Sequence, residues 1–246
     1  KNISMEPEFA GICGITKDEL HTTLRHDVER LATVLGQTTE QVYEQLKFQY
    51  DGYHFCEQSP DIYSPFSLFN SLHSKRITNY WFGSATPTML IKYMQNSGSP
   101  LDLSALDGKR VRLERFDIPL EMADDAIPLL LQSGYLTIKS YNADENSYII
   151  GIPNNDVRMG LSNNLLPILS QCSKDCNDDF IYDFKHAIKT DNLSAAKQLL
   201  YAYLAGIPCD ILKDRGEHTY HAIFYAIFSL LGFPPKIENG SARGYS

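Results

Sequence analysis

Pro128-Leu-Leu-Leu-Gln-Ser-Gly-Tyr-Leu-Thr-Ile-Lys139 is the stretch of sequence on which the fold prediction depends. Residues 123–133 contain a run of leucines and end at Gly134, a pattern typical of a helix and its C-terminal stop. Residues 135–141 are rich in aromatic and β-branched side chains and favour a strand. We therefore expect a helix that leads directly into a strand.

The residues that follow extend this unit into a hairpin. Asn142-Ala-Asp-Glu-Asn146 is rich in turn-forming residues, and residues 147–152 predict a second strand. Pro153-Asn-Asn-Asp156 then predicts a helix that begins at about Asp156. Because winged-helix domains close with a helix, a hairpin and a helix, we expect a small α+β winged-helix-like module.

The region on the N-terminal side of this module predicts a helical bundle. Thr16-Lys-Asp-Glu19 and Thr38-Thr-Glu-Gln41 are capping boxes, in which the threonine hydroxyl and the third side chain each satisfy a backbone amide. Ser64-Pro65 and Thr86-Pro87 predict two further helix starts.

The region on the C-terminal side is also predicted to be helical. Helices are expected at residues 179–189, 194–205 and 217–231, and Gly232 with Pro234-Pro235 ends the last one. The predicted fold class is thus mainly α, with domains at residues 1–106, 107–175 and 176–246.

Composition excludes several classes of protein. Of 246 residues, 43% are hydrophobic and the formal net charge is -8, which favours an ordinary globular protein over one that binds nucleic acid by bulk charge. The apolar stretches are shorter than the roughly 20 residues of a membrane span, and Lys1–Pro7 has no signal-peptide core. We expect a cytoplasmic protein with no membrane partner and with its 5 cysteines reduced.

Motifs for cofactor and metal chemistry are missing from the sequence. No Gly-x4-Gly-Lys-Ser/Thr phosphate-binding loop occurs. Glu217-His-Thr-Tyr-His221 lacks the order and spacing of the His-Glu-x-x-His zinc motif, and Cys172 and Cys176 have no second ligand pair. We therefore expect no cofactor and no metal in this chain.

Two groups of side chains leave alternatives open. An aromatic set either stacks on bases or packs in a core: Tyr50, Tyr53, Phe55, Tyr63, Tyr80 and Trp81. Lys139 and Arg158, with Lys109, Arg110 and Arg112, either form a basic face on the hairpin module that binds nucleic acid, or are scattered solvated charges.

Several strings carry a resemblance to a known family. They are Tyr50-Asp-Gly-Tyr-His-Phe55, Tyr63-Ser-Pro-Phe-Ser-Leu68, Asn79-Tyr-Trp-Phe82, Pro128 to Lys139, and Gly151-Ile-Pro-Asn154 with Val157-Arg158. In this order they resemble the AAA-ATPase-like family, which is mostly bacterial. The resemblance implies an N-terminal P-loop ATPase domain and a C-terminal domain of the PD-(D/E)xK nuclease superfamily in the whole protein.

The resemblance also implies where the chemistry would lie. The ATPase core would precede Lys1, so ATP and Mg²⁺ are expected only for a longer parent protein. Residues 176–246 would contain a helical linker and the truncated start of the nuclease-like α/β domain. Glu217 matches the helix glutamate of that nuclease site, and Glu238 lies before the turn that leads to its missing aspartate.

The sequence therefore predicts a part of a larger protein without a complete catalytic site. We expect a scaffold or regulatory role, with the remaining parts of the same polypeptide as partners. The alternative is a module that binds nucleic acid or protein without enzymatic activity. The parent is expected to bind ATP, and as a nuclease it would process nucleic acid.

Overall fold

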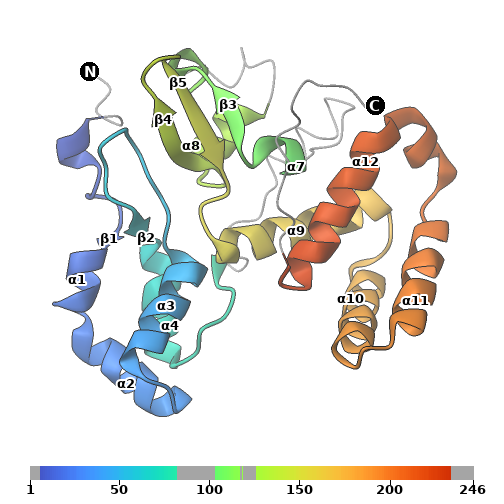
Figure 1. The fold of residues 1–246 in the computed structure, drawn as a ribbon, viewed down its shortest axis with the longest axis horizontal. Helices are drawn as coiled ribbons and strands as arrows, with labels where there is room; N and C mark the ends of the chain where they lie inside the picture. Colours follow the sequence, from blue (N-terminus) through green and yellow to red (C-terminus); the bar gives the residue numbers. More distant parts are fainter. Residues whose placement is uncertain (1–5, 82–102, 117, 119–125, 234–246) are drawn as a thin grey trace. The chain divides into compact units, whose positions relative to one another are not determined.

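The computed structural model describes residues 6–81, 103–116, 118 and 126–233, which form two compact units (Figure 1). The first unit contains residues up to 86 together with residues 107–160, and the second contains residues 87–106 and 161–246. The units divide the chain after residues 86, 106 and 160, and they group the hairpin with the N-terminal helices.

The first unit begins with short helices and a two-stranded sheet. In the described residues before position 107, its elements are η1 (Pro7–Phe9), β1 (Ile15–Thr16), α1 (Lys17–His21), α2 (Arg25–Leu35), α3 (Thr39–Tyr50), β2 (Ile62–Tyr63) and α4 (Pro65–Ser74). Both predicted capping boxes are confirmed, at Thr16 with Glu19 and at Thr38 with Gln41. The predicted helix start at Thr86 lies outside the described residues.

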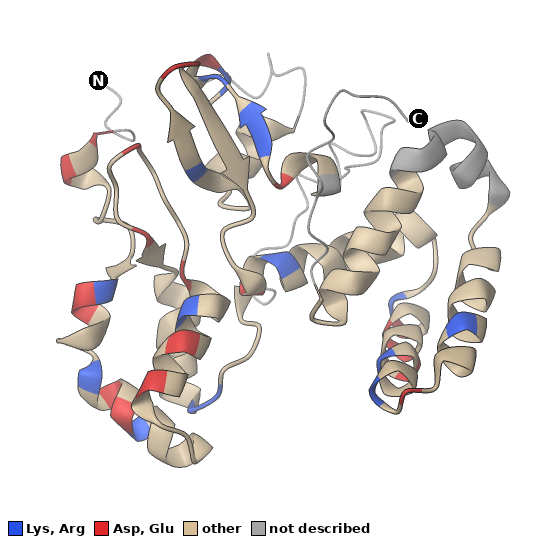
Figure 2. Ribbon diagram, in the orientation of Figure 1, with Lys and Arg blue, Asp and Glu red and all other residues tan. Residues whose placement is uncertain are grey.

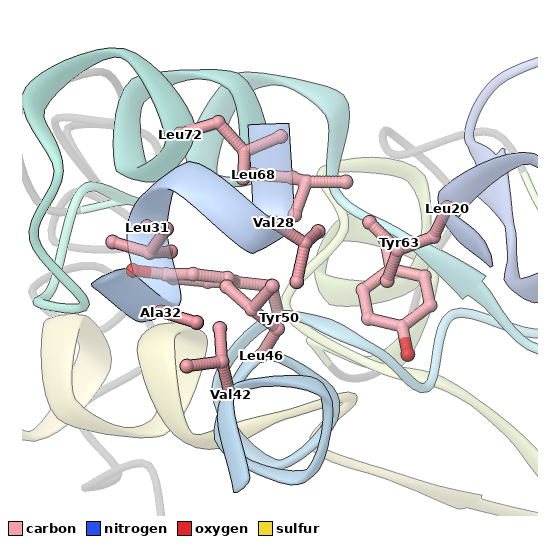
Figure 3. Close-up of a cluster of buried hydrophobic side chains, with 10 residues drawn as sticks. All are labelled: Leu20, Val28, Leu31, Ala32, Val42, Leu46, Tyr50, Tyr63, Leu68 and Leu72. Carbon is pink, nitrogen blue, oxygen red and sulfur yellow. The ribbon is translucent and has the colours of Figure 1, made fainter. Parts of the chain in front are cut away.

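The core of these helices is a cluster of buried side chains contributed by α1 to α4 and β2 (Figure 3). The cluster consists of Leu20, Val28, Leu31, Ala32, Val42, Leu46, Tyr50, Tyr63, Leu68 and Leu72. The N-terminal helices thus bury apolar side chains against one another, as amphipathic helices do.

The hairpin module completes the first unit. Its elements are β3 (Lys109–Val111), η2 (Leu113–Arg115), α8 (Ile127–Gln132), β4 (Thr137–Asn142), β5 (Ser147–Gly151) and the first turns of α9 (Asn155–Ser170). The strands form an antiparallel sheet in the order β3-β5-β4, with β3 and β4 at the edges. The predicted helix, hairpin and helix are present, while β3 is a strand that the sequence analysis did not predict.

The second unit is helical in its described part. It contains α7 (Leu103–Leu106), the rest of α9, α10 (Lys174–Lys189), α11 (Leu193–Ala205) and α12 (Cys209–Leu230). Ser173 caps α10 by accepting a hydrogen bond from the backbone amide of Cys176, so this helix begins earlier than predicted. None of the helices in the described ranges combines the length and the apolar character that crossing a bilayer requires.

Candidate functional site

The two basic residues predicted to contact nucleic acid lie near a single carboxylate, that of Asp107. Arg158, in the first turn of α9, donates from Nη1 to Asp107 Oδ2 over 2.7 Å, and the two side chains are 15% and 19% exposed. The other oxygen, Oδ1, accepts a hydrogen bond from the backbone amide of Ile152 over 3.0 Å. Asp107 therefore ties α9 to the end of β5.

Lys139 is also held within the molecule. Its Nζ donates to the carbonyl oxygen of Pro153 over 2.9 Å, although the residue as a whole is exposed on β4. Loss of hydration around the ammonium lowers the pKa of Lys139, and the carboxylates of Asp107 and Asp61 partly oppose this shift. The geometry thus gives both Lys139 and Arg158 internal partners, which favours a structural role over contact with nucleic acid.

The loop that carries Tyr50-Asp-Gly-Tyr-His-Phe55 closes onto the same place. Gly52 has a φ of +105°, and a Cβ added there would lie 2.4 Å from the carbonyl oxygen of Pro153. Only glycine fits both the backbone conformation and this close approach. We call the set Gly52, Asp107, Lys139, Pro153 and Arg158 the junction.

Asp156 supports the junction from the first turn of α9. It is 1% exposed, and its two carboxylate oxygens lie 3.2 and 3.1 Å from the backbone nitrogen of Trp81, which donates to them. Burial raises the pKa of this carboxyl group, and hydrogen bonds from Ser67 and Trp81 oppose the shift. Asp156 therefore connects α9 to the chain after α4.

The aromatic set packs around this connection. The ring centroid of Trp81 lies 6.3 Å from that of Tyr53 and 6.1 Å from that of Tyr135. The Tyr53 hydroxyl donates to the carbonyl of Gly134 over 3.1 Å, and the Tyr50 hydroxyl donates to Thr78 over 2.6 Å. Of the two alternatives for Tyr50, Tyr53 and Tyr63, core packing is correct, because these side chains are buried.

A hollow of about 340 Å³ opens beside the junction. It is lined by Glu44, Lys47, Phe48, Asp51, Gly52, Asp61 and Pro153. Asp51 is 8% exposed, and its Oδ1 has no hydrogen-bond partner within the described part of the chain. Desolvation raises the pKa of Asp51, and the like charge of Asp61 adds to the shift. No group of three potential metal ligands occurs among the described residues.

The nuclease-like residues are not brought together in the described residues. Glu217 lies on α12, as predicted for a helix glutamate, but its side chain is outside the described part. Glu238 lies outside the described residues altogether. Cys172 and Cys176 are free thiols.

A basic surface separate from Lys139 and Arg158 lies on β3. Lys109 and Arg110 are exposed on this edge strand, and Arg112 is exposed directly after it. The signal was present in the sequence as Lys109-Arg-Val-Arg112, but without the strand assignment its charges could not be placed on one edge.

Comparisons with known proteins find a distant relative of this chain. The chain is 23% identical over 257 residues to a protein of Azotobacter chroococcum mcd 1 described as "Uncharacterized protein in vnfD 5'region". The match covers 99% of this chain and 45% of the relative, so the chain spans about half of that protein's length. No family model and no solved structure matches the chain.

We expect Gly52→Ala to destabilise the protein more than Gly36→Ala does. Both glycines have a positive φ, but an added Cβ at Gly36 meets nothing within 4 Å. Gly36→Ala should cost about 1–2 kcal/mol for the left-handed backbone alone, and Gly52→Ala should cost more because of Pro153. Urea denaturation measures both values, and equal losses would contradict the close packing at the junction.

We expect Asp51→Asn to be more stable than the wild type near neutral pH. Because folding raises the Asp51 pKa above 3.8, the folded chain binds more protons between pH 3.8 and that raised value, and wild-type stability increases as the pH falls through this window. The asparagine variant lacks this gain, so its advantage should shrink on acidification. An advantage that is constant or grows between pH 7.5 and 4, measured by urea denaturation, would contradict this assignment.

Proposed function

We propose that this chain is a scaffold region of a larger ATPase-like protein, in which it presents a winged-helix-like module on a helical support. The observation that carries the proposal is the junction. Three of the strings that resemble the AAA-ATPase-like family meet there, and they supply Gly52, Lys139 and Arg158. Their contacts are internal, which supports a structural role for these strings.

The chemistry of the described residues supports the same proposal. Asp107 and Arg158 form an ion pair, and Asp156 accepts a hydrogen bond from the backbone amide of Trp81. These are the contacts of a rigid connection, since the charged groups of Asp107, Asp156 and Arg158 have partners within the fold. In the proposed whole protein, ATP and Mg²⁺ would be bound by another region, and nuclease chemistry would need groups beyond Glu217 and Glu238.

The purified 246-residue chain should neither hydrolyse ATP nor cleave DNA in the presence of Mg²⁺. The reason is that it lacks a phosphate-binding loop and a complete carboxylate site. Phosphate release and plasmid nicking are the measurements, with Glu217→Gln as the matched variant. Identical blank-level values are expected for both chains. Turnover by the wild type that Glu217→Gln abolishes would overturn the proposal.

A further inference from the structure

We propose that the edge strand β3 and the residue after it form a docking surface for the phosphate backbone of double-stranded nucleic acid. The surface, which we call the basic edge, consists of Lys109, Arg110 and Arg112. It goes beyond the scaffold role and does not depend on it. The partner is identified by charge, because three cations within four residues stand out on a chain whose net charge is -8.

The basic edge is accessible from solvent. β3 pairs only with β5 in the sheet order β3-β5-β4, so its other side has no partner strand in the described sheet. Lys109, Arg110 and Arg112 are all exposed, while Val111 between them is buried. Figure 2 shows β3 as a blue arrow at the edge of the sheet.

The two arginines lie around one hollow. Residues two apart in a strand project to the same face, about 6.6 Å apart at the usual rise per residue. Arg110 and Arg112 indeed line one hollow of about 510 Å³, together with Val111, Glu145 and Ser147. Guanidinium groups form bidentate hydrogen bonds to phosphate oxygens, so this spacing suits neighbouring phosphates of one strand.

The basic edge makes one weak ion pair within the described part of the chain, between Arg110 and Glu145. Arg110 Nη1 lies 2.7 Å from Glu145 Oε2, but the two side chains are 61% and 48% exposed. Such exposed pairs contribute little to stability, so a phosphate can replace Glu145. Within the described part of the chain, Lys109 and Arg112 form no ion pair. The basic edge is thus available for an anionic partner, unlike Arg158.

The helix of the module does not read bases. In helix-turn-helix proteins, polar side chains of a helix contact base edges in the major groove. α8 has the sequence Ile-Pro-Leu-Leu-Leu-Gln, without a charged residue, and Ile127, Pro128 and Leu130 are buried. Binding through the basic edge should therefore depend on phosphates and not on sequence.

Binding of a short labelled DNA duplex of mixed sequence tests the proposal by fluorescence anisotropy. Each phosphate contact contributes about -0.9 to the slope of log affinity against log salt. Three contacts predict about a 40-fold loss of affinity when salt rises from about 50 to about 200 mM. Arg110→Gln combined with Arg112→Gln should leave one contact and a loss of about 3-fold. A second duplex of unrelated sequence should bind equally well.

Two further variants make the test decisive. The double variant Arg25→Gln with Arg30→Gln also removes two positive charges, but from exposed positions on α2, and it should leave DNA binding unchanged. Glu145→Gln releases Arg110 and should tighten binding. The proposal is overturned by absence of binding at low salt, by equal loss in both double variants, or by weaker binding of Glu145→Gln. A preference for one sequence would also contradict it.

Discussion

The ion pair between Arg158 and Asp107 is the interaction on which the arrangement of the hairpin module depends. It joins Asp107 to a segment 45 to 51 residues later in the chain, because Asp107 also accepts the amide of Ile152 and Arg158 lies in the first turn of α9. Both side chains are mostly buried, so the loss of one partner would leave a charge without solvation, a much larger penalty than at the surface. Asp156, in the same turn of α9, adds a second connection, to the backbone of Trp81.

The sequence strings that resemble the AAA-ATPase-like family contain the residue types that the contacts around the junction require. Gly52 is required by the approach to Pro153, and Tyr53 and Trp81 fill the space between the aromatic loop and the helix before β4. Residues that are distinctive in a sequence are often taken for a catalytic site, but a tight polar connection makes equally specific demands on residue type. The basic edge differs in this respect, because its side chains stabilise little within the fold and remain open to a partner.

Much of the fold could be predicted from local signals. The capping boxes, the hairpin and the start of α9 each depend on residues within a few positions of one another, and all were confirmed. The strand β3 was missed because three residues carry no periodicity, and only pairing with β5 makes them a strand. The roles of Lys139 and Arg158 could not be predicted either, since their partners Pro153 and Asp107 become neighbours only after folding.

A double-mutant cycle on Asp107 and Arg158 tests the central claim most directly. The free energies of unfolding of Asp107→Asn, Arg158→Met and the combined variant would be compared with the same cycle on the exposed pair of Asp27 and Arg30. The account predicts a coupling of about 1–3 kcal/mol for the junction pair, against about 0.2–1 kcal/mol or less for the exposed pair. Equal coupling in the two cycles would contradict the claim that this ion pair holds the hairpin module together.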